Sequence, residues 1–137
     1  MLHMTKKNIK NFKPAFTLIE MMIVIVIIAI LVGIAYPNYS KQIQTSRRTD
    51  GRSALLDYAM KFEEFYGANY TYTGADTQYG LTTTPVTDGG FYKISASIPT
   101  TDTYTLTATA IGAQLKDTAC PNFSINQTGS RMPSTCW

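Results

Sequence analysis

Residues 16–36 read FTLIEMMIVIVIIAILVGIAY, and this stretch decides how the rest of the chain is interpreted. Thirteen of its 21 residues are Leu, Ile, Val or Phe, and Glu20 is its one charged residue. A helix of that length is roughly 30 Å long, about the thickness of the hydrocarbon core of a bilayer. The apolar residues contribute about −4 to −8 kcal/mol to insertion, which outweighs the roughly +3 kcal/mol cost of one buried acid. We therefore predict a single membrane-spanning helix.

Charge is distributed unevenly around this segment. Residues 1–15 hold four lysines and no acid. Of the chain's 12 basic and 9 acidic residues, 8 basic and all 9 acidic residues therefore lie in residues 16–137. The net charge of residues 16–137 is therefore close to zero, which excludes a basic nucleic-acid-binding domain. The only histidine is His3, in the leader, so the body lacks a histidine base or ligand. We expect no enzyme, no cofactor and no metal site.

The orientation of the membrane helix is inferred from the cysteines, because basic residues lie on both sides of the apolar segment and do not indicate which side faces the cytoplasm. Cys120 and Cys136 both lie near the C-terminus, which favours an oxidising compartment for that side and the cytoplasm for the leader. The alternative is that both cysteines are free thiols.

The processing of the N-terminal segment stays open from the residues alone. Signal peptidase could cut after Gly33-Ile34-Ala35, or the segment could be an uncut signal anchor.

The pattern after the apolar run predicts a second helical part. From residue 37 to 66, aromatic and aliphatic residues recur at spacings of three and four, which is typical of an amphipathic helix. Gly67 is a stop signal. The Tyr-, Thr- and Gly-rich residues 67–90 are too many for a structureless loop, and we expect a surface-presented segment.

The last third of the chain alternates between apolar and polar residues. This period of two predicts strands over 92–98 and 104–110 with one buried face. Residues 123–125 read as a short third strand, and the turn at 127–129 leads to a fourth strand near Arg131.

Glu20 has two interpretations. Thr17-Leu18-Ile19-Glu20 matches a capping box, and an acid in the first turn suits the helix dipole. Capping alone does not explain why an acid is carried into a membrane, where an ionisable group usually has a partner.

Residues 13–28, KPAFTLIEMMIVIVII, closely resemble the cleavage and methylation signature of type IV pilins, which type II secretion pseudopilins share. The resemblance implies that prepilin peptidase cuts between Ala15 and Phe16 and methylates the new Phe16 amine. Ala15 departs from the glycine that usually precedes the cut. The resemblance also assigns Glu20 and Thr17 to assembly, and we expect Glu20 to pair with the Phe16 amine of a neighbouring subunit.

The resemblance extends along the stalk. Pro37 removes the donor that would pair with the Gly33 carbonyl, so a kink is predicted at the place where many pilins carry a proline. The alternative is a helix that ends at the membrane boundary.

The C-terminal region, residues 117–129 with Cys136-Trp137, resembles the disulfide-bounded end of small minor pilins of the PilE type. It implies a Cys120–Cys136 bond, worth about 3 kcal/mol for a loop of this length. Lys116 and Arg131 flank the loop and could touch phosphate, as in DNA-uptake pilins. Two charges are a weak electrostatic footprint, so we expect solvated surface there, with a weak DNA contact through Lys116 and Arg131 as the alternative.

Together these features predict an α+β type IV pilin fold of the type IVa class, in which a long N-terminal helix packs on a small antiparallel sheet with a C-terminal disulfide loop. We expect a structural pilus subunit, a minor pilin, made in the inner membrane and assembled with other pilins into an extracellular fimbrium. Adhesion, twitching motility and DNA uptake are its candidate roles, and a type II secretion pseudopilin or a secreted binding module are the alternatives. The expected parts are a leader (1–15), a stalk helix (16–66) made of a transmembrane half (16–36) and an amphipathic half (37–66), an αβ-loop (67–90) and a sheet head (91–137).

Overall fold

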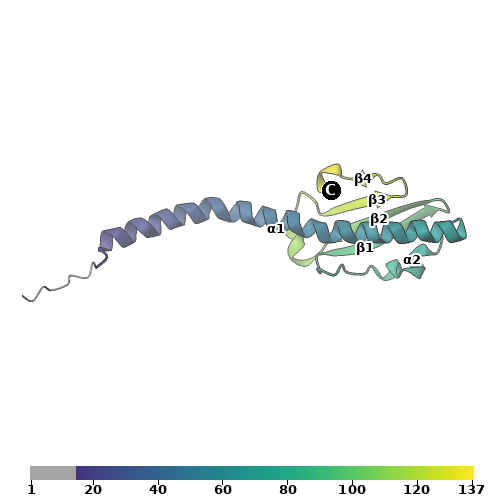
Figure 1. Ribbon diagram of the computed structural model, residues 1–137, viewed down its shortest axis with the longest axis horizontal. Helices are drawn as coiled ribbons and strands as arrows, with labels where there is room; N and C mark the ends of the chain where they lie inside the picture. The colour runs from purple at the N-terminus through teal and green to yellow at the C-terminus, as the bar shows by residue number, and fades with distance from the viewer. Residues whose placement is uncertain (1–14) are drawn as a thin grey trace, which may run out of the picture. The chain divides into compact units, whose positions relative to one another are not determined.

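The computed structural model describes residues 15–137, so the expected leader lies outside the described residues except for Ala15. The chain divides into two compact units, one that ends at Pro37 and one that spans Asn38–Trp137 (Figure 1). Helix α1 (Leu18–Asn69) runs through the boundary between them.

The first unit is an apolar helix whose side chains are all exposed. Residues 18–37 include no buried position, and the large hydrophobic residues among them are about 44–78% exposed. Helix α1 is long and apolar enough to cross a membrane, with a mean hydropathy of 3.1 in its most apolar window. The expected helix over the apolar run is therefore confirmed.

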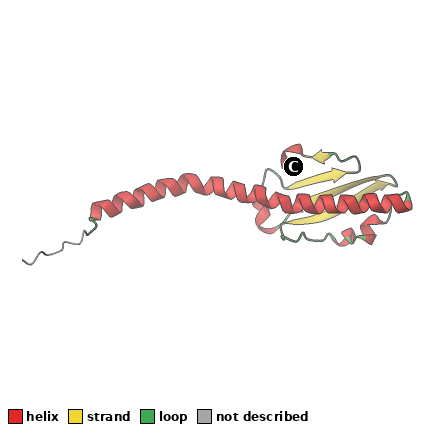
Figure 2. Ribbon diagram, viewed as in Figure 1, coloured by secondary structure: helices red, strands yellow, loops and turns green. Residues whose placement is uncertain are grey.

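The second unit, the head, is a four-stranded antiparallel sheet covered on one face by the second half of α1 (Figure 2). The strands follow chain order: β1 (Tyr92–Thr100), β2 (Thr103–Ala110), β3 (Asn122–Asn126) and β4 (Arg131–Met132). All four expected strands are present, which confirms the sequence prediction.

The alternation in the strands places one row of side chains against α1. Leu106 pairs with Ala96 on one side and with Ile125 on the other, and these registers bring the apolar positions onto one face. Leu55 and Phe62 of α1 are fully buried against this face, and Tyr58 and Tyr66 are partly buried. The core includes these strand residues: Tyr92, Ile94, Tyr104, Leu106, Ala108, Ala110, Phe123 and Ile125.

Gly51 sets how closely α1 approaches the sheet. A Cβ at this position would lie 2.8 Å from the Phe123 ring and 3.0 Å from the Tyr92 ring. Glycine weakens a helix interior by about 1 kcal/mol relative to alanine, so its position here is explained by the packing. The sequence interpretation did not single out this residue.

The connection after the helix begins later than the sequence predicted. The helix does not stop at Gly67 but continues to Asn69, where Tyr70 adopts a left-handed φ of 53° and its N–H donates to the Tyr66 carbonyl at 2.8 Å. More than half of residues 70–90 are exposed, which fits a surface-presented segment, but the connection also packs on the head. It contains a short helix α2 (Ala75–Gln78) and a 3-10 turn η1 (Leu81–Thr83), and it contributes Tyr72, Ala75 and Leu81 to the core.

A carboxylate ties this connection to the helix and the sheet. Glu63 of α1 accepts hydrogen bonds from the Tyr72 hydroxyl and the Tyr104 hydroxyl, each at 3.0 Å. The two tyrosine rings also meet edge to face, with centroids 4.7 Å apart. Burial, followed by the hydrogen bond to Glu63, raises the pKa of Tyr72 to about 12 and raises the pKa of Tyr104.

The close approach at Gly51 predicts a large penalty for any side chain there. We expect Gly51→Leu to lower the free energy of unfolding by about 3 kcal/mol, because the buried rings cannot make room without strain. The measurement is denaturant unfolding of the full chain in detergent. Gly67→Ala is the matched control, since nothing lies within 4 Å of a Cβ there, and it should raise stability by up to about 1 kcal/mol. Equal effects at the two glycines would contradict the packing argument.

The raised tyrosine pKa values predict alkaline destabilisation. The neutral tyrosines are favoured in the folded chain, so their contribution is complete below the unfolded pKa of about 10 and is lost as the pH rises through the folded pKa. Above pH ~10 the free energy of unfolding should fall by about 1.4 kcal/mol per pH unit for each tyrosine. Ultraviolet absorbance should show two tyrosines that ionise last, and Glu63→Gln should lower the pKa of both. If all nine tyrosines ionise together near pH ~10, the Glu63 network does not exist in solution.

Candidate functional site

The N-terminal end of α1 presents the predicted processing and assembly residues. Ala15, Phe16 and Thr17 precede the helix, and the Glu20 backbone N–H donates to the Thr17 hydroxyl oxygen at 3.3 Å. Thr17 therefore caps the helix, as the capping interpretation requires. The Glu20 side chain is exposed, and its carboxylate makes no ion pair with any residue in 15–137. Its pairing with a neighbouring amine stays a prediction.

Gly33 and Pro37 both lie inside α1. The helix continues through Pro37, so the alternative that it ends at the membrane boundary is wrong. The division between the two compact units falls directly after this proline. The kink itself stays a prediction.

The expected disulfide joins Cys120 to Cys136, whose Cα atoms are 5.7 Å apart. Both cysteines are buried, which excludes the alternative of two free thiols. Arg52 of α1 donates from Nε to the Cys136 carbonyl at 2.8 Å, so the helix holds the closed loop directly. The Trp137 ring packs edge-on against Phe123, with centroids 5.7 Å apart.

A partly buried ion pair attaches the other end of this region to α1. Arg48 makes a two-point contact with the Asp117 carboxylate, through Nε at 2.7 Å and a terminal nitrogen at 2.8 Å. The hydrogen bond to Asp117 raises the pKa of Arg48. The buried Gln114 side chain donates to Asp117 at 3.0 Å and to the Tyr92 hydroxyl at 2.9 Å. No local signal in the sequence identified this network, since Arg48 and Asp117 are 69 residues apart.

The structure does not bring the two candidate phosphate contacts into a larger basic patch. Lys116 ends the 3-10 turn η2 (Gly112–Lys116), and Arg131 lies on β4, with its guanidinium carbon 4.9 Å from the Trp137 ring centroid. Residues 38–137 hold 8 basic and 8 acidic residues, and Arg48 and Lys61 are already paired with carboxylates. The basic footprint of the head is therefore small.

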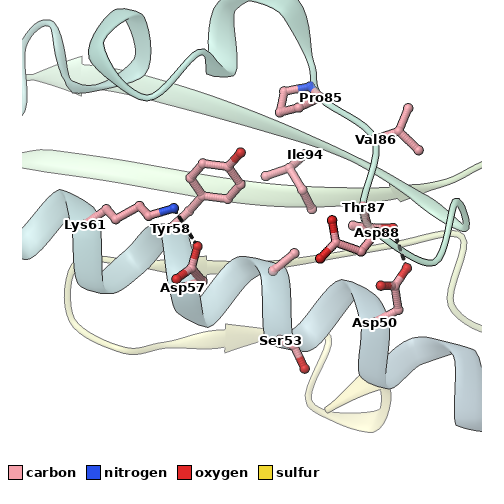
Figure 3. A pocket seen from close by; sticks show the side chains of 11 residues that line it. Asp50, Ser53, Asp57, Tyr58, Lys61, Pro85, Val86, Thr87, Asp88 and Ile94 are labelled. Atoms are coloured by element: carbon pink, nitrogen blue, oxygen red, sulfur yellow. Dashed lines mark hydrogen bonds and ion pairs between the residues drawn. The ribbon is translucent and has the colours of Figure 1, made fainter.

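An acidic groove of about 430 Å³ lies between α1 and residues 85–88 (Figure 3). Its carboxylates belong to Asp50, Asp57 and Asp88, but two of them are engaged. Asp57 pairs with Lys61 at 2.7 Å, and Asp50 accepts hydrogen bonds from the Thr87 hydroxyl and from the Gly89 N–H. Within residues 15–137, no group of three or more potential metal ligands is present. The hydrogen bonds that Asp50 accepts therefore hold residues 87–89 against the helix.

Comparisons with known proteins agree with this architecture. Residues 37–124 match the model of the family "Type IV minor pilin ComP, DNA uptake sequence receptor", and residues 11–36 match the "Prokaryotic N-terminal methylation motif".

One curated relative is the type IV wide pilus major component PilA4 of Thermus thermophilus. It is 34% identical over 124 residues, which cover 88% of this chain and 91% of that protein. A solved type IV pilin from Shewanella oneidensis superposes with a TM-score of 0.53 at 26% identity, over 69% of this chain and 97% of that one.

These matches favour a pilus over a secretion pseudopilin or a secreted module. Pilins are structural proteins that assemble with other pilins, and the methylation motif with its apolar helix fits a membrane-anchored precursor. The chain belongs to the ComP-type minor pilins of the type IV pilin family and is a structural subunit of the type IV pilus.

Proposed function

We propose that this minor pilin is cut between Ala15 and Phe16 by prepilin peptidase, is N-methylated at Phe16, and waits in the inner membrane with its leader in the cytoplasm. The pilus assembly machinery then draws it into an extracellular fibre through residues 16–36. One observation carries the proposal: among the described residues 15–137, nothing buries any residue of the apolar half of α1. Such a surface needs cover from lipid or from other helices.

The transfer from lipid to fibre needs a driving force other than the hydrophobic effect. Lipid tails are as apolar as the side chains of residues 23–32, so helix association depends on packing and on polar contacts. Glu20 supplies a polar contact of this kind. In a low dielectric a paired charge is far less costly than a lone one, and the loss of one partner is strongly destabilising.

The partner that we propose for Glu20 is the Phe16 amine of another subunit. The Phe16 amine of the same chain lies at the same helix end, where it is poorly placed to reach Glu20. A neighbour displaced along the fibre axis brings its own amine to the depth of Glu20. The pair then fixes the register of each incoming subunit.

We further propose that Gly33 and Pro37 provide a flexible joint in the stalk. Proline removes one helical hydrogen bond and crowds the preceding turn, which makes bending easier at this point. The boundary between the two compact units at Pro37 supports this assignment.

Variants at Glu20 and Thr17 separate pairing from capping. We expect Glu20→Gln to insert into the membrane but to be strongly depleted from sheared pili, because the charge that attracts the neighbouring amine is gone. Thr17→Val removes only the cap hydrogen bond, worth about 1 kcal/mol, and should deplete the pili far less. The measurement is the ratio of subunit in sheared filaments to subunit in membranes. Equal depletion by the two variants would support capping and contradict pairing.

A second function, DNA binding during uptake, is favoured by the matched family, whose description names a DNA uptake sequence receptor. We propose that Lys116 and Arg131 contact phosphates beside the disulfide loop. The stacking of Arg131 on Trp137 holds its guanidinium at the surface and lowers the ordering cost of such a contact. The net charge of the head limits the number of phosphates it can neutralise.

Duplex DNA binding by the detergent-solubilised chain tests this second function. We expect weak binding that falls with salt, and the double variant Lys116→Ala/Arg131→Ala should reduce the slope of log K against log salt by about 2. Lys61→Ala is the control, since its ammonium already pairs with Asp57, and it should leave the slope nearly unchanged. No binding at low salt would refute DNA contact by this subunit.

A further inference from the structure

Two stretches of the chain meet where the head begins, and we call them together the base: residues 38–48 and 112–118. The fully buried Gln114 side chain donates from Nε2 to the Gln44 carbonyl oxygen of α1 at 3.0 Å. Arg48 of α1 pairs with Asp117 at 2.7 Å. These two contacts hold η2 beside the part of α1 with which the head begins.

The charges of the head are separated along its length, although its basic and acidic residues are equal in number. The base holds four basic residues and one acid, and that acid is already paired with Arg48. Residues 57–78 and 100–103 together hold five acids and one basic residue. The Tyr66 hydroxyl donates to the Asp102 carboxylate at 3.1 Å, which brings these two acidic stretches to the same end of the head. The head is therefore positive at its base and negative at its far end.

The base also exposes side chains that are suited to a lipid–water interface. Leu115 is 65% exposed and Tyr39 is 67% exposed. Lys41 and Lys116 are exposed, and neither forms an ion pair within residues 15–137. Tyrosine is enriched at membrane interfaces, and a lysine can place its apolar stem beside lipid while its charge reaches the headgroups.

The base follows the apolar run closely enough to meet the surface of the bilayer. Because α1 is continuous from Tyr36 to Lys41, Lys41 lies about 8 Å beyond the end of the apolar run along the helix. The headgroup layer on one side of a bilayer is roughly 5–8 Å thick. Lys41 therefore reaches the lipid phosphates when residues 16–36 span the membrane. The membrane helix keeps the base at this surface, so a small number of charges is enough for a contact.

We propose that, before assembly, the base docks on anionic phospholipid headgroups of the membrane that holds residues 16–36. Lys41 and Lys116 contact the lipid phosphates. Leu115 and Tyr39 enter the boundary between the headgroups and the acyl chains. This docking rests on the membrane-anchored precursor of the proposed function.

The separation of charge also sets the orientation of the docked head. An anionic bilayer attracts basic residues near its surface, and its potential falls off within about 10 Å. Glu63, in the acidic end, lies about 29 Å from Gln44 along α1. A head that lies flat on the bilayer brings these acids to the negative surface, so the head is expected to rest on its base. Docking therefore opposes the removal of the subunit from an anionic membrane.

Quenching by labelled lipids in reconstituted vesicles tests the docking. The native cysteines are bonded to each other, so a single introduced cysteine can carry a fluorophore. Ala113→Cys places the fluorophore on η2, and Thr77→Cys places a control on exposed α2 at the acidic end. The full chain is reconstituted into phosphatidylcholine alone or into an equal mixture with phosphatidylglycerol, and both contain lipids with a nitroxide on the headgroup. We expect several-fold stronger quenching of the η2 label in the mixed vesicles, lost at high salt, and no quenching of the α2 label in either.

Variants of the base identify the side chains that make the contact. The double variant Lys41→Gln/Lys116→Gln should lower the ratio of docked to free heads about 25-fold, or about five-fold for each lysine. Leu115→Ser should weaken quenching in both kinds of vesicle, because it removes the apolar part of the contact. Arg131→Gln is the matched control, since Arg131 is also basic and exposed but lies on β4, outside the base, and it should leave the quenching unchanged.

The outcomes separate the docking from the proposed function. Equal quenching with and without phosphatidylglycerol, equal quenching of the two labels, or a double lysine variant that behaves as the wild type would overturn the docking alone. A chain that does not float with the vesicles would overturn the membrane-anchored precursor, and the docking with it.

Discussion

Within residues 15–137, no other part of the chain covers the first half of α1, and the rest of the molecule depends on that constraint. Residues 18–37 form a helix in which no side chain is buried. In water this surface would aggregate, so the chain needs a bilayer before assembly and sister helices after it. Because the two environments are equally apolar, a polar contact such as Glu20 can decide between them.

The head meets a different constraint, since it has few large apolar residues with which to build a core. After Ser40 only 15 residues are Leu, Ile, Val or Phe. Small domains of this kind commonly add covalent and polar fastenings. Here the disulfide closes the C-terminal region, the Arg48–Asp117 pair attaches it to α1, and Glu63 binds the tyrosines of the connection and the sheet. These contacts hold the C-terminal region and the connection against the second half of α1.

The features that the sequence predicted well are those with a local signal. Strands β1 and β2 alternate with a period of two, and the apolar run is long enough to span a bilayer. The disulfide followed from a resemblance, not from spacing. Long-range side-chain contacts have no local sequence signal, because Asp50 contacts Thr87 and Glu63 contacts Tyr104 only after the chain folds. The helix end predicted at Gly67 was wrong, because a helix ends where a residue adopts the left-handed backbone conformation, and that residue here is Tyr70. The roles of Phe16 and Glu20 depend on other molecules, so they remain predictions.

Intact-mass measurement of the subunit recovered from sheared pili shows whether residues 16–36 stay in the fibre. We expect one species that begins at Phe16 and carries a single methyl group on its amine, with two hydrogens fewer than the reduced chain because of the Cys120–Cys136 bond. A chain that begins at Tyr36 and is found only in the medium would contradict it, because the helix that we assign to the fibre would then have been removed.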